Sequence, residues 1–71
     1  MKTKEKDINK LEQYKKIILK NVTKEYQSTG KISYLAGVNY YETHNVLKQL
    51  EKQRVIENMK KGLTYNFWRL K

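Results

Sequence analysis

Residues 40 to 48 offer the richest set of side chains for contacting another molecule. Tyr40 and Tyr41 carry hydroxyl groups on aromatic rings, His44 an imidazole, Asn45 a primary amide and Lys48 a positive charge. An amide can pair with adenine, an aromatic ring can pack on a thymine methyl group, and hydroxyl or ammonium groups can donate to phosphates. On one helix face these side chains could contact DNA together, with Asn45 as the first candidate for reading a base.

Further basic residues could extend that surface. Lys60 and Lys61 directly precede Gly62 in an expected hairpin tip, where positive charge can lie along or in a minor groove. Lys31 is expected to contact phosphates together with Lys48. The many lysines of the first 24 residues are expected to form a mostly solvated surface.

Charge and composition narrow the class of protein. The chain has 71 residues, with 16 lysines and arginines against seven acidic residues, so its formal net charge is +9. This excess favours polyanionic partners, and the length suits one small domain. Because cysteine is absent and histidine occurs once, neither a disulfide framework nor a usual zinc site is expected. We expect no metal and no cofactor.

The sequence also argues against an enzyme and a membrane protein. It has neither a paired-carboxylate arrangement suited to a pocket nor a glycine-rich loop to cradle phosphates, so we expect no catalysis. Its apolar runs are far too short to span a membrane, and its N-terminus lacks the apolar stretch of a signal peptide. The expected location is the cytoplasm.

Hydrophobic spacing predicts the elements that must position these residues. A one-sided stripe predicts a long first helix over residues 7–28, with residues 1–6 frayed and Gly30 as its C-cap. The stripe consists of Ile8, Leu11, Ile18, Val22 and Tyr26. Tyr14 and Ile17 lie away from its centre, and they either cover an edge of the core or meet a partner helix in a homodimer.

A second region, residues 31–53, predicts two shorter helices. Lys31 and Ile32 are expected to form a very short strand, followed by one or two helical turns that Gly37 ends. Asn39 then has the type and position of an N-cap, with Glu42 as its reciprocal partner in a capping box. The helix that it starts should run to about residue 53. Its inward face is expected to comprise Thr43, Val46, Leu47 and Leu50.

Residues 54–70 predict a β-hairpin. Two segments rich in β-branched and aromatic residues flank the sequence KKG, which has the composition of a short basic turn. In the second strand, Trp68 and Leu70 share one face, and Leu63, Tyr65 and Phe67 share the other. The expected fold is therefore mainly helical, with three helices and a small β-hairpin. One face of the hairpin should pack on the helices, and the other should be partly exposed or meet a partner.

This order of elements, and the residues at the turn, resemble a winged helix-turn-helix DNA-binding domain. In that family a glycine, an apolar residue and a capping Ser or Asn precede the recognition helix, followed by apolar residues at fixed spacing. The matching residues here are Gly37, Val38, Asn39, Thr43, Leu47, Leu50, Val55 and Ile56, and the closing WRL is similar to the end of the second wing strand. The match covers residues 31–70, although Arg54 stands where the family often has glycine. The chain is similar both to small fimbrial-operon regulators and to small basic winged-helix proteins of thermophilic archaea and of their viruses and plasmids.

The resemblance implies a protein that binds double-stranded DNA, reads sequence and regulates transcription by occupying its site. The helix from Asn39 would enter the major groove, and the basic wing would lie on the adjacent groove or backbone. Two alternatives remain open: a winged-helix module for protein-protein interaction, and a nonspecific architectural DNA-binding protein. RNA binding is less expected, since the sequence lacks the aromatic sheet motif of an RNA-recognition domain. A long first helix in this family commonly pairs in a homodimer.

Overall fold

The computed structural model describes residues 2–62 and 65–71, with side chains from residue 10 onward within those ranges. The elements in chain order are α1 (Lys2–Asn21), β1 (Gln27–Ser28), α2 (Thr29–Ala36), α3 (Tyr40–Lys52), β2 (Ile56–Lys61) and β3 (Tyr65–Leu70). The expected mainly helical chain with a C-terminal hairpin is confirmed, and β1 adds a third strand. Leu63, expected on one face of the hairpin, lies outside the described residues.

Helix α1 has different bounds from those expected. It begins at Lys2, so the expectation of frayed residues is wrong for 2–6, a stretch rich in the good helix formers Lys and Glu. It ends at Asn21 and not near Ser28. The reason is that Gln27 and Ser28 pair with β3, and pairing with a distant strand overrides the helical spacing that had included Tyr26.

Helix α2 also begins earlier than expected. The Ser28 hydroxyl caps it by accepting a hydrogen bond from the Lys31 backbone N–H at 3.1 Å. Gly30 therefore lies inside the first turn of α2, and its expected role as the C-cap of the first helix is wrong. Lys31 and Ile32 are likewise helical, and the short strand lies at Gln27–Ser28 instead.

The turn into α3 confirms Asn39 as the expected N-cap, but among the described side chains the reciprocal bond to the Glu42 carboxylate that would complete a capping box is absent. Gly37 adopts a left-handed conformation with φ of 69°, and the Val38 N–H donates to the Ser33 carbonyl at 3.2 Å. Asn39 then accepts a hydrogen bond through its side-chain oxygen from the Glu42 backbone N–H at 2.9 Å. The helix ends at Lys52, within one residue of the expected end.

The end of α3 has the same type of turn without a glycine. Arg54 has a φ of 62° and donates its N–H to the Glu51 carbonyl at 2.9 Å, while the Val55 N–H donates to the Leu50 carbonyl at 3.0 Å. These two bonds define a Schellman motif, in which the left-handed residue is usually glycine. The departure of Arg54 from the family pattern is therefore accommodated by a left-handed arginine.

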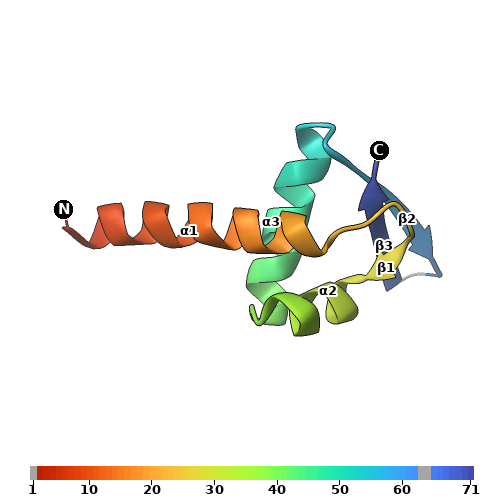
Figure 1. The fold of residues 1–71 in the computed structure, drawn as a ribbon, viewed down its shortest axis with the longest axis horizontal. Coiled ribbons are helices and arrows are strands. Elements are labelled where there is room, and N and C mark those ends of the chain that lie inside the picture. The colour runs from red at the N-terminus through yellow and green to blue at the C-terminus, as the bar shows by residue number, and fades with distance from the viewer. Residues whose placement is uncertain (1, 63–64) are drawn as a thin grey trace.

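The three strands form an antiparallel sheet in the order β1-β3-β2. Trp68 in the central strand lies opposite Gln27 of β1 and Asn58 of β2. Figure 1 shows all three helices on one side of this sheet. Because side chains alternate along a strand, one sheet face meets the helices and the other does not.

The core lies between the helices and the inner face of the sheet. The indole N–H of Trp68, which is fully buried, donates to the Thr29 hydroxyl at 2.8 Å and so joins β3 to the start of α2. The expected inward residues of α3 are confirmed, since Thr43, Val46, Leu47 and Leu50 are all buried. The remaining apolar core residues are Ile18, Val22, Ile32, Val38 and Ile56. None of the described helices is long and apolar enough to cross a membrane.

Candidate nucleic-acid interface

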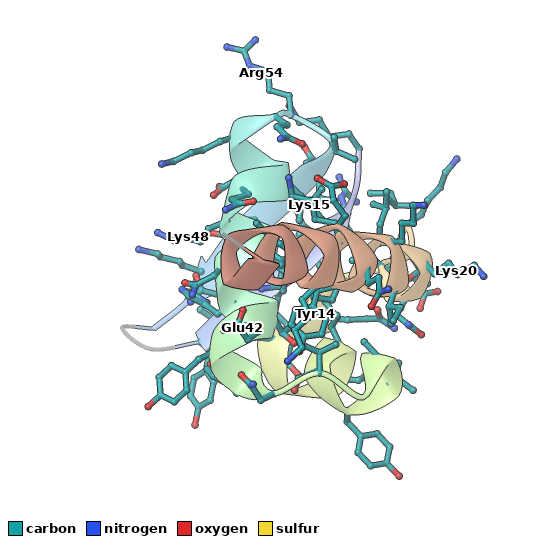
Figure 2. All side chains as sticks on the ribbon, turned by 90° about the vertical axis from the view of Figure 1, so that its left-hand side faces the viewer. Tyr14, Lys15, Lys20, Glu42, Lys48 and Arg54 are labelled. Carbon is teal, nitrogen blue, oxygen red and sulfur yellow. The ribbon has the colours of Figure 1, made fainter. Side chains whose placement is uncertain are left out.

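The side of α3 that faces away from the core carries the side chains singled out from the sequence. Tyr40 is 48% exposed and Tyr41 81%, and Asn45 and Lys48 are also exposed. Spacings of four and eight residues place Tyr40, His44 and Lys48 on the same side of a helix. In Figure 2 Lys48 points to the side toward which the β2–β3 hairpin projects. We call Tyr40, Tyr41, His44, Asn45 and Lys48 the outward side of α3.

His44, expected among the DNA-contacting residues, is more enclosed than the other residues on the outward side of α3. It is half-buried, and its ring lies edge to face with the buried Trp68 ring at 6.0 Å between centroids. Its Nδ1 atom is buried without a hydrogen-bond partner, so any contact with a ligand would come through Nε2. The Tyr40 ring lies parallel to the imidazole at 6.4 Å between centroids. His44 therefore supports Tyr40 from the core.

The beginning of α3 adjoins α1 across an open cavity of about 480 Å³ lined by Lys10, Leu11, Tyr14, Asn39 and Glu42. Figure 2 shows Tyr14 and Glu42 near one another between the two helices. Glu42 is half-buried there and does not belong to the outward side of α3. Tyr14 packs against the core, in agreement with the expectation that it covers an edge of the core and not with the alternative of a contact to a partner helix.

The tip of the hairpin presents the two expected lysines. Lys60 and Lys61 are both exposed, and Gly62 follows them with a φ of 68°. Lys60 pairs with Asn66 and Lys61 with Tyr65, so the two side chains point to opposite faces of the hairpin. The positive charge at this tip therefore covers both faces.

The third group of expected contacts lies on α2. Lys31 is exposed in the first turn of this helix. Tyr34 is 84% exposed and was not singled out from the sequence. Its place two residues after the buried Ile32 could have indicated that it faces outward. The outward side of α3 is thus one continuous set, whereas Lys31 and the hairpin lysines stand on separate elements.

Few negative charges offset these lysines near the hairpin. Glu57 in β2 is paired with Arg69 in β3, with 2.7 Å between the Glu57 Oε2 and Arg69 Nε atoms. This hydrogen bond raises the pKa of Arg69 above its ordinary value. Among the described side chains, no cluster of three or more acidic or histidine residues is placed to hold a metal ion.

No protein-family model, curated protein or solved structure matches this chain. Function therefore has to be inferred from the side chains and their geometry.

Proposed function

We propose that this protein is a winged helix-turn-helix protein that binds double-stranded DNA and regulates transcription by occupying its site. In this proposal α3 is the recognition helix and the β2–β3 hairpin is the wing. The observation that carries it is the division of α3 into a buried side and an outward side with exposed amide, aromatic and basic groups.

The dimensions of α3 suit a major groove. Its 13 residues make a helix of about 20 Å at 1.5 Å per residue. The major groove of B-DNA is about 12 Å wide and admits one helix, whose first turns approach the base edges. The outward residues fall in the first three turns of α3, so their side chains would enter the groove.

Each outward residue has a distinct role in this arrangement. Asn45 would pair with an adenine edge through its amide. Tyr40 and Tyr41 would donate to phosphates or pack on thymine methyl groups, and Lys48 and Lys31 would contact phosphates. Lys60 and Lys61 would extend the footprint to the adjacent groove or backbone.

We also propose that the protein is a homodimer through α1. Figure 1 shows the N-terminal part of this helix extending beyond the other elements, and the molecule measures 41 × 20 × 20 Å. Ile17 is 40% exposed and, with Leu19, Lys16 and Lys20, lines a mostly apolar open cavity of about 400 Å³. Since Tyr14 packs on the core, Ile17 would carry the contact. Such a dimer would bind inverted half-sites about one DNA turn, roughly 34–36 Å, apart.

The test is fluorescence anisotropy with a random-sequence duplex and a duplex from the region upstream of the protein's own gene, each across a salt series. Tighter binding to the second duplex that persists as salt rises is the expected result. Equal binding that weakens steeply with salt would indicate nonspecific architectural binding instead.

A protein-interaction module is the second candidate, favoured by the 84% and 81% exposure of Tyr34 and Tyr41. Exposed aromatic side chains are enriched in protein interfaces. The absence of binding to either duplex at low salt would favour this candidate.

A further inference from the structure

The sheet has a second face that none of the described helices covers (Figure 1). Ile56 and Trp68 are fully buried and point toward the helices, so the residues that alternate with them point the other way. Direct cross-strand pairs on this second face are Met59 with Phe67 and Lys61 with Tyr65. We call this surface the outer sheet face; its residues are Tyr26, Ser28, Glu57, Met59, Lys61, Tyr65, Phe67 and Arg69.

Aromatic rings occupy the middle of the outer sheet face. Tyr65 and Phe67 stand two residues apart on the central strand, a separation of about 6.8 Å. This is roughly twice the 3.4 Å between stacked bases. The two rings could therefore each take one base of an extended single strand. Tyr65 is 66% exposed, and Phe67 is half-buried between its neighbours Ser28 and Met59.

The charge of the outer sheet face favours an anionic occupant. Its acidic residue, Glu57, is already paired with Arg69, whose guanidinium also lies 4.7 Å from the centre of the Tyr26 ring. Lys61 is exposed, pairs with Tyr65 across the strands and adds a basic side chain to this face. A nucleic acid matches both features of this face, because its phosphates are attracted to the basic side chains and its bases can stack on the aromatic rings.

We propose that the outer sheet face binds single-stranded nucleic acid, with bases stacked on Tyr65 and Phe67 and a phosphate bound by Lys61. Proteins that bind single strands without sequence preference combine such stacking rings with positive charge. This site lies on the sheet, whereas the proposed duplex contacts lie mainly on α3. The inference therefore does not rest on duplex binding.

The test compares two variants in which the same substitution, tyrosine to serine, removes one exposed ring. Tyr65→Ser removes a ring from the outer sheet face, and Tyr34→Ser removes one from α2, on the helical side of the sheet. The probes are fluorescein-labelled oligothymidylate and oligouridylate of about 12 nucleotides, within the range of single-strand footprints. Far-UV circular dichroism and Trp68 emission verify that both variants are folded.

The expected result is that Tyr65→Ser weakens binding of at least one oligonucleotide by about fivefold to a hundredfold, whereas Tyr34→Ser changes it less than twofold. The loss should be the same at low and high salt, because stacking releases no counterions. Lys61→Ala should instead reduce the slope of log K against log salt by about 0.7. Asn45→Ala, a change on α3, should leave oligonucleotide binding unchanged while it lowers the preference for the native duplex.

Three results would overturn the proposal. One is that the wild-type protein binds neither oligonucleotide at low salt, and another is that Tyr65→Ser and Tyr34→Ser bind equally well. The third is that the free protein is a dimer that Tyr65→Ser makes monomeric without any effect on oligonucleotide binding. That outcome would assign the outer sheet face to a second copy of the chain.

Discussion

The residues of α3 show how far side-chain roles follow from position alone. Its buried side was predictable residue by residue, because a helix with apolar residues at spacings of three and four must bury that side. His44 was not predictable in the same way. Its contact is with Trp68, which reaches it only after the sheet has formed. A local pattern carries no information on such a neighbour.

Asn45 provides the residue-scale prediction. Asn45→Ala should reduce the preference for the native duplex over a random one by about 1–3 kcal/mol, because it removes the proposed adenine contact. Binding to the random duplex should change little. The measurement is the ratio of the two dissociation constants by anisotropy.

The matched control for Asn45 is Gln53→Ala, which removes an exposed amide at the other end of α3. This control should leave the ratio unchanged. If both variants change the ratio equally, or neither does, then Asn45 does not read a base.

The ends of α2 and α3 allow a prediction at the scale of elements. Gly37 and Arg54 occupy equivalent left-handed positions, and a Cβ added at Gly37 would meet no atom within 4 Å. Only the backbone conformation therefore opposes a side chain there. Gly37→Ala should lower the free energy of unfolding by about 1 kcal/mol, and Arg54→Gly should raise it by about 0.5–1 kcal/mol.

Thermal unfolding measures both changes, since about 1 kcal/mol moves the midpoint by roughly 4–8 °C in a domain of this size. Arg54→Ala is the control, because it removes the same charge but keeps a Cβ in the left-handed conformation. Its stability should stay close to that of the wild type. Equal stabilisation by Arg54→Ala and Arg54→Gly would mean that the charge, not the backbone, is the cause.

The hairpin tip supplies a second prediction at this scale. Lys60→Ala combined with Lys61→Ala should weaken binding to every duplex and reduce the slope of log K against log salt by up to about 1.8, or two phosphate contacts. The control removes Lys20 and Lys24, and Lys20 points away from the side of Lys48 (Figure 2). An equal loss of slope in both double variants would exclude the hairpin as a specific part of the footprint.

The elements differ in how well the sequence predicts them. The start of α3 and the C-terminal hairpin depend on local signals, namely the Asn39 cap and the turn at Gly62, and both were predicted. The end of α1 was not predicted. It depends on β1, which forms only by pairing with Phe67 and Trp68, about 40 residues later in the chain. The prediction that Gly30 caps the first helix was also wrong, because Ser28 caps α2 and Gly30 lies inside that helix.

At the scale of the whole molecule, the extended α1 leads to a prediction of the oligomeric state. We expect the wild-type protein to sediment as a dimer, and Ile17→Lys to shift it to a monomer by placing a charge in the proposed apolar contact. Analytical ultracentrifugation measures both species. Glu12→Lys adds the same side chain at an exposed position of α1 that does not share the side of Ile17, and it should leave the dimer intact.

A wild-type monomer at high micromolar concentration would contradict the proposed dimer. So would equal dissociation of both variants, because this would attribute the effect to added charge in general. Either result would mean that the protein binds DNA as a monomer, with α3 on a single half-site.

The central claim is that the outward side of α3 and the hairpin tip bind duplex DNA, and amide chemical-shift mapping tests it most directly. Isotope-labelled protein is titrated with the upstream duplex, and shifts are compared over all assigned residues. We predict that the largest shifts fall on residues 40–48 and 60–62, while the buried side of α3 and the end of α1 change little. Shifts confined to α1 or to Tyr65, Phe67 and Arg69 of the outer sheet face, or no shifts at all, would contradict the account.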